Sequence, residues 1–89
     1  MSSRAIRILG IDPGLRRTGW GVIASEGSRL SFLACGIIRP DVDLPLGDRL
    51  AVIHEALTAI VSAHAPDEVA VEQVVPRAAR RLVAVPPLP

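Results

Sequence analysis

Residues 8–23 read ILGIDPGLRRTGWGVI, and this stretch decides the fold because two apolar runs flank one short polar turn. The first run alternates as a strand does and ends at Asp12. Pro13 and Gly14 follow it as a turn signal. The second run, at 19–24, begins only a few residues later, so the stretch predicts two neighbouring strands.

Beyond this stretch the pattern adds a strand, a helix and a final strand. A third apolar run at 30–38 predicts an antiparallel meander. Apolar residues from Leu46 to His64 recur at helical spacing, which predicts an amphipathic helix. The run 68–75 returns to a strand pattern, and the helical crossover allows it to lie parallel to the first strand. We therefore predict a mixed α/β sheet in the order 3-2-1-4.

The composition limits the class of protein. The chain has 89 residues, of which 49% are hydrophobic, so a domain this small exposes apolar surface that more chain or a partner should cover. The formal net charge is only +1, so any DNA contact must come from local clusters of arginine. No stretch approaches the roughly 18 apolar residues of a membrane span, and we expect a cytoplasmic protein with no membrane partner.

Three side chains are expected in the core. Trp20 and Phe32 are the only aromatic residues, and core packing is the simplest role for them. Cys35 is the one cysteine, and its apolar surroundings in the sequence predict a small buried side chain.

Two carboxylates are candidates for chemistry. Asp12 ends an apolar strand, and Glu72 is set in the apolar fourth strand. If these strands are neighbours, the two carboxylates lie close together and favour a shared cation. Hard oxygen ligands select magnesium or manganese over zinc. The alternatives stay open that Asp12 only caps the turn and that Glu72 leans into solvent.

The turn between the first two strands could hold a phosphate near such a metal. Its backbone donors and guanidinium groups suit an anion, although the same residues also suit an ordinary solvated turn. The candidate DNA-binding residues are Gly14, Arg16, Arg17, Thr18 and Gln73.

These features together resemble the RuvC family of crossover junction endodeoxyribonucleases. The resemblance runs over 6–74 through ILGIDPGLRRTGWGVI, RLSFLACGIIRP, LPLGDRLAVIHEAL and PDEVAVEQV. The joint presence of IDPG near the start and VEQV on the fourth strand is specific, whereas neither tetrapeptide is persuasive alone.

The resemblance implies a fold, an activity and partners. The fold would be ribonuclease H-like, and the protein a cytoplasmic homodimer that resolves four-way (Holliday) junction DNA in recombination and repair, alongside a branch-migration helicase complex. The activity would be that of a magnesium-dependent endonuclease, a hydrolase with four acidic residues, of which Asp12 matches the first and Glu72 the second. Two ions would then act on the scissile phosphodiester, one activating water and the other stabilising the leaving oxygen.

Two departures from the family pattern stand out. Val75 occupies a position where the family usually has an aromatic residue, and no Asp or Glu follows Glu72. We therefore expect 1–75 to be the amino-terminal part of a truncated nuclease domain, inactive by itself and with its fourth strand at an open edge. Residues 76–89, rich in Pro and Arg, are expected to be an unstructured or frameshifted tail.

Other functions remain open. The actin and sugar-kinase group also begins with a D-x-G turn that holds ATP phosphates, although VEQV argues against it. A YqgF-like resolvase shares the Asp-x-Gly opening but less of the remaining detail. From a different class, the chain could be a non-catalytic fragment for DNA binding or dimerisation.

Overall fold

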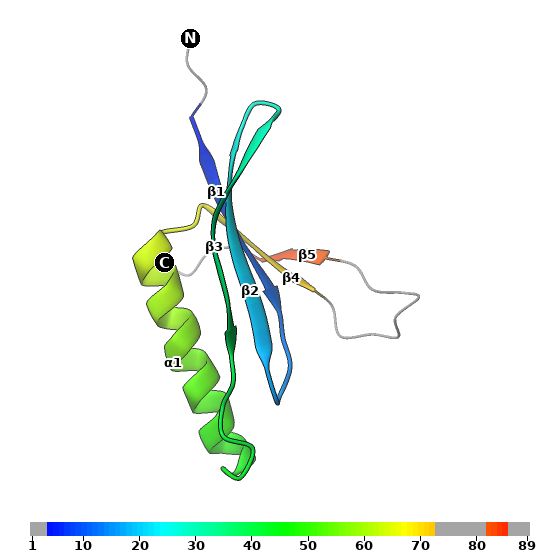
Figure 1. The fold of residues 1–89 in the computed structure, drawn as a ribbon, viewed down its shortest axis with the longest axis vertical. Coiled ribbons are helices and arrows are strands. Elements are labelled where there is room, and N and C mark those ends of the chain that lie inside the picture. The colour runs from blue at the N-terminus through cyan, green and yellow to red at the C-terminus, as the bar shows by residue number, and fades with distance from the viewer. Residues whose placement is uncertain (1–3, 73–81, 86–89) are drawn as a thin grey trace.

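The computed structural model describes residues 4–72 and the backbone of 82–85. Its elements, in chain order, are β1 (Ile6–Asp12), β2 (Thr18–Glu26), β3 (Arg29–Ile38), α1 (Leu46–His64), β4 (Glu68–Glu72) and β5 (Leu82–Val85) (Figure 1). The three predicted strands of the meander and the bounds of the predicted helix are confirmed. For the fourth strand, 68–72 is confirmed, whereas 73–75 lie outside the described residues.

The strands form one sheet in the order β3-β2-β1-β4-β5. Pairing is antiparallel between β1 and β2 and between β2 and β3, whereas β4 runs parallel to β1. The predicted mixed sheet with the order 3-2-1-4 is therefore confirmed. A crossover through α1 makes the parallel pairing possible, because parallel neighbours cannot be joined by a tight turn.

The edge beyond β4 differs from the expectation. Residues 76–89 were expected to be an unstructured or frameshifted tail, but Leu82–Val85 form β5, antiparallel to β4, with Glu72 opposite Leu82. The open edge of β4 offers unpaired backbone groups, and a short apolar segment can satisfy them. Residues 76–81 and 86–89 lie outside the described residues, so the division of the chain at residue 75 and the frameshift stay predictions.

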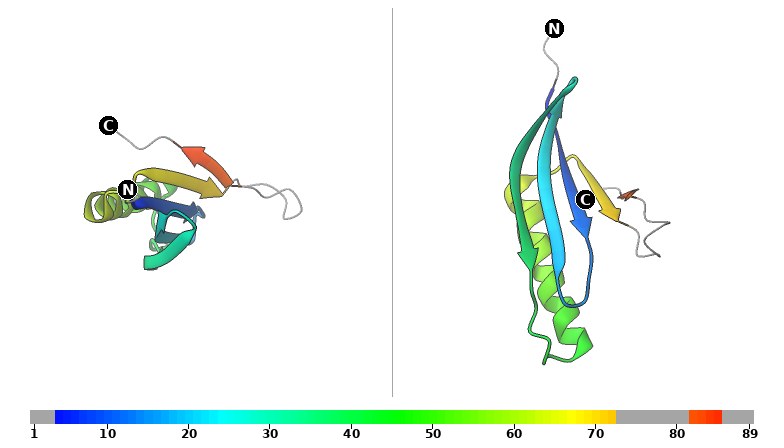
Figure 2. Two further views of the ribbon diagram at one scale, coloured as in Figure 1. Left: turned by 90° about the horizontal axis from the view of Figure 1, so that it is seen from above. Right: turned by 45° about the vertical axis from the view of Figure 1, so that its right-hand side comes forward.

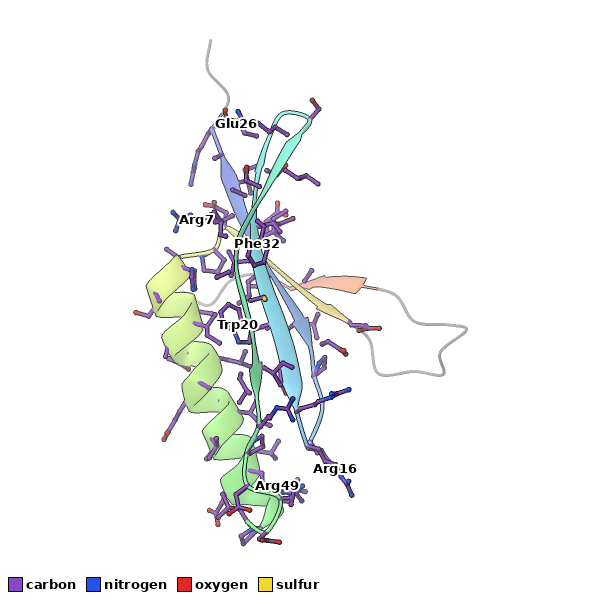
Figure 3. The ribbon with its side chains drawn as sticks, viewed as in Figure 1. Arg7, Arg16, Trp20, Glu26, Phe32 and Arg49 are labelled. Carbon is purple, nitrogen blue, oxygen red and sulfur yellow. The ribbon has the colours of Figure 1, made fainter. Side chains whose placement is uncertain are left out.

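The small core lies on the face of the sheet that α1 covers. Leu9 and Val22, which are paired across β1 and β2, are fully buried, and Ile38 is nearly so. Trp20 lies on this face and points toward α1, where its ring centroid is 5.7 Å from that of His64 (Figure 3). Gly36 makes room for the indole, because a Cβ there would lie 2.8 Å from Trp20 Nε1.

No described element covers the opposite face of the sheet (Figure 2). Phe32, paired with Ile23, and Cys35, paired with Gly21, lie on this face and are exposed, Phe32 by 69%. The expectation that both are core residues was therefore wrong. Their apolar run gave no sign of which face of the sheet would be covered.

The helix is lightly packed along its length. It ends in a left-handed Ala65, whose N–H donates to the carbonyl of Val61 at 2.8 Å. None of its residues is fully buried, and Leu46 and Leu50 are about half exposed. Its apolar stripe is therefore only partly covered by the described residues. Within 4–72 and 82–85, no helix has the length and hydropathy that a membrane crossing requires.

Candidate functional site

The parallel pairing of β1 and β4 brings Asp12 and Glu72 to the same end of the sheet. Paired Cα positions run from Ile8 opposite Glu68 to Ile11 opposite Val71. One step further along this register, Asp12 and Glu72 are the last residues of their strands. Neighbouring strands lie about 4.8 Å apart and paired residues point to the same face, so the two carboxylates can reach one ion.

A pocket joins the two carboxylates. Asp12 is exposed and Glu72 is half-buried, and both line a hollow of about 240 Å³. Its other lining residues are Gly10, Ile11, Gly19, Trp20 and Gly21. The pocket lies on the uncovered face of the sheet, so a large ligand can approach it.

Three glycines form the floor beside Asp12. Gly10 is paired with Gly21, and Asp12 is paired with Gly19, so all three glycines share the face of the carboxylates. A Cβ on Gly19 would lie 3.9 Å from the Cβ of Asp12, which is an ordinary contact, so packing within the sheet does not require glycine there. Strand glycines often mark a place where a ligand approaches the backbone closely. Sequence reasoning missed this floor, although glycine inside an apolar strand pattern was the available signal.

The loop between β1 and β2 is closed by Gly14 and Thr18. The Gly14 N–H donates to Thr18 Oγ1 at 3.3 Å, and the Thr18 hydroxyl donates to the Gly14 carbonyl at 3.1 Å. Thr18 is 1% exposed, and a Cβ on Gly14 would collide with the carbonyl of Arg17. Both residues were predicted to bind DNA. In the structure they hold the shape of the loop, and the Thr18 side chain faces away from solvent.

Arg16 and Arg17 are exposed on this loop, and Arg16 extends outward at the end of the sheet (Figure 3). Together with Asp12 they line a second, larger pocket of about 660 Å³. Arg16 and Arg17 therefore line a pocket to which the candidate metal ligand Asp12 also belongs. Gln73, the remaining predicted contact, lies outside the described residues.

The donor set suits a partly hydrated ion. Among the residues that the structure describes, no group of three or more His, Cys, Asp or Glu is placed to hold a metal. Two carboxylates in an open pocket fit magnesium, which keeps several of its waters and is commonly held by one or two protein carboxylates. Asp12 and Glu72 would therefore be two ligands of an open site rather than parts of a closed cage.

The fold is that of a ribonuclease H-like domain. It combines a meander, a helical crossover and a parallel fourth strand, with two acidic residues at adjoining strand ends. The family model for the crossover junction endodeoxyribonuclease RuvC matches residues 8–83. The chain belongs to the RuvC family.

Individual relatives agree with this assignment. The chain is similar to RuvC of Methylorubrum populi, with 62% identity over 68 residues that cover 76% of this chain and 36% of the relative. It is 64% identical to RuvC of Afipia carboxidovorans over 73 residues, which cover 82% of this chain and 43% of the relative. The chain thus spans less than half the length of these relatives.

Solved structures show the same fold. The structure described as "T. thermophilus RuvC in complex with Holliday junction substrate" matches with a TM-score of 0.72 and 30% identity, over 81% of this chain and 45% of that one. A second structure of Thermus thermophilus RuvC matches with a TM-score of 0.70 and 29% identity, over 78% and 46% of the two chains.

Proposed function

We propose that this chain supplies the amino-terminal half of a metal-dependent endonuclease site that acts on four-way junction DNA. The observation that carries the proposal is the register of β1 and β4, which places Asp12 and Glu72 opposite each other at one pocket. The metal would be magnesium, with manganese as a substitute, because both prefer carboxylate oxygen. A bound ion would activate water and stabilise charge on the phosphodiester.

Each part of the site has its own task in this proposal. Asp12 and Glu72 orient the ion at the uncovered face of the sheet. Arg16 and Arg17 bind the DNA backbone beside it, because guanidinium groups pair well with phosphate oxygens. The glycine floor of Gly10, Gly19 and Gly21 would leave space for the sugar-phosphate chain near the carboxylates.

Cleavage needs more than the described residues bring together. A two-metal site holds its ions about 4 Å apart and needs further ligands beyond two carboxylates. We therefore propose that the chain by itself binds metal and junction DNA but does not cut. The homodimer, the branch-migration complex and a cytoplasmic location belong to the same proposal, and the resemblance to the RuvC family is their only support.

A direct assay is binding of the purified chain to a synthetic four-way junction, with a linear duplex of the same sequence as control. We expect the junction to be bound more tightly than the duplex in magnesium, and no cleavage. Equal affinity for the two DNAs would contradict a junction-selective site and favour a general DNA-binding module. Tight ATP binding would favour the actin and sugar-kinase alternative, which the family match does not support.

A further inference from the structure

Another acidic residue lies beside the β1–β4 pair, at the end opposite to Asp12 and Glu72. Asp67, which directly precedes β4, faces Arg7 of β1. The Asp67 N–H donates to the Arg7 carbonyl at 2.8 Å, and the Arg7 N–H donates to Asp67 Oδ2 at 2.9 Å. Asp67 thus exchanges two hydrogen bonds with the backbone of one residue.

Arginine side chains complete this cluster. The Arg4 guanidinium donates to Asp67 Oδ1 at 2.7 Å, and the Arg7 guanidinium donates to the His64 carbonyl, at the end of α1, at 2.8 Å. The Arg4 side chain is 82% exposed, so solvent screens its ion pair and little stability is expected from it. The two bonds to the Arg7 backbone are the part of the cluster that fixes geometry.

These bonds set the register that the metal site needs. Arg7 and Asp67 come one position before Ile8 and Glu68, the first registered pair of β1 and β4. A slip of one residue would turn every side chain of β4 to the other face of the sheet and carry Glu72 away from Asp12.

Hydrophobic burial contributes little to the choice of register between β1 and β4. β4 is only five residues long and none of them is fully buried, so its apolar residues gain little from one register over another. On its other side, β5 adds only four residues. The half-buried Val69 and Val71 favour this register only weakly, so the hydrogen bonds of Asp67 add a local constraint where β4 begins.

We propose that Asp67 is a positioning residue for the metal site: its carboxylate locks β4 to β1 in the one register that sets Glu72 opposite Asp12. The proposal rests on the proposed function only in naming the site that is positioned. The register itself can be measured without metal.

The test uses two substitutions with opposite effects on charge and geometry. Asp67→Asn removes the charge but keeps an oxygen that accepts from the Arg7 N–H. Asp67→Glu keeps the charge and can still pair with Arg4, but its longer side chain displaces the carboxylate from the Arg7 N–H. Register is read from disulfide formation in the Asp12→Cys/Glu72→Cys variant with Cys35→Ser, because paired positions on adjacent strands lie within bridging distance.

We expect Asp67→Asn to keep the disulfide yield and the manganese affinity of the wild-type carboxylates, and Asp67→Glu to lower both, the affinity by about tenfold. The reverse order, or no change in disulfide yield for Asp67→Glu, would overturn the proposal. Circular dichroism of both variants checks that α1 is retained. If the disulfide pattern is as expected but the wild-type chain binds no manganese, the proposed function fails and the role of Asp67 in the register stands.

Discussion

Asp12 and Glu72 end two adjacent parallel strands in matching register, and both line one pocket on the uncovered face of the sheet. Asp12 and Glu72 are sixty positions apart in the sequence. Arg7 and Asp67, at the other end of the same two strands, are also sixty positions apart. The site therefore depends on tertiary pairing and not on a local motif.

Gly14 is required by the shape of the loop between β1 and β2. Gly14→Ala would bring a methyl group against the carbonyl of Arg17, and we expect the free energy of unfolding to fall by about 1–3 kcal/mol. Gly47→Ala is the matched control, because a Cβ at Gly47 meets nothing within 4 Å and alanine favours the helix. Urea denaturation measures both. Equal stabilities for the two variants would contradict the tight loop.

Gly36 should report on the packing of Trp20. Gly36→Ala would place a methyl 2.8 Å from the indole nitrogen, so the ring must move away from its place beside His64. Because Trp20 is the only tryptophan, a shift in its fluorescence maximum and a lower unfolding midpoint are expected together. An unchanged spectrum would mean that the indole does not lie over Gly36.

Arg16 and Arg17 should carry the affinity for DNA. Replacing either by alanine is expected to weaken junction binding and to lower the slope of log affinity against log salt by about one. Arg29→Ala is the control, since Arg29 is exposed at the start of β3, at the other end of the sheet. Fluorescence anisotropy at several salt concentrations tests this. An equal loss for Arg29→Ala would indicate a diffuse charge effect instead of a loop contact.

The open face should make the chain self-associate. Phe32 is 69% exposed, and Ile37 on the same strand is 51% exposed. Exposed apolar surface of this kind promotes association. We therefore expect Phe32→Thr to remain monomeric up to a higher protein concentration than the wild type, with little change in the free energy of unfolding. Size-exclusion chromatography with light scattering follows the change. If Phe32→Thr associates as strongly as the wild type, another surface is responsible.

The sequence was sufficient for the elements that have clear local signals. Alternation, the Pro13-Gly14 turn and helical periodicity predicted the meander, α1 and the parallel fourth strand. The joint presence of IDPG and VEQV indicated the family. The sequence did not predict features that depend on contacts between residues far apart in the chain. The pairing of β5, the exposure of Phe32 and the hydrogen bonds of Asp67 depend on which strand or layer lies opposite, and local pattern carries no such information.

The candidate site could also be predicted only in part from the sequence. Asp12 and Glu72 were chosen as candidate ligands because a charged residue in an apolar strand is costly without a partner, and their role stays a prediction. Thr18 was predicted to bind DNA, which stays a prediction, and the sequence did not indicate that closure of the loop on Gly14 buries its side chain. The glycine floor beside Asp12 became recognisable only once the antiparallel register aligned Gly10 with Gly21.

The most direct test is a manganese titration followed by electron paramagnetic resonance, with Asp12→Asn, Glu72→Gln and the control Glu26→Gln. Glu26 lies at the far end of the sheet from the site (Figure 3). A shared ion predicts about one manganese per wild-type chain and a loss of affinity of about tenfold or more in each of the two site variants. Unchanged binding in Asp12→Asn or Glu72→Gln, or an equal loss in Glu26→Gln, would contradict the metal site.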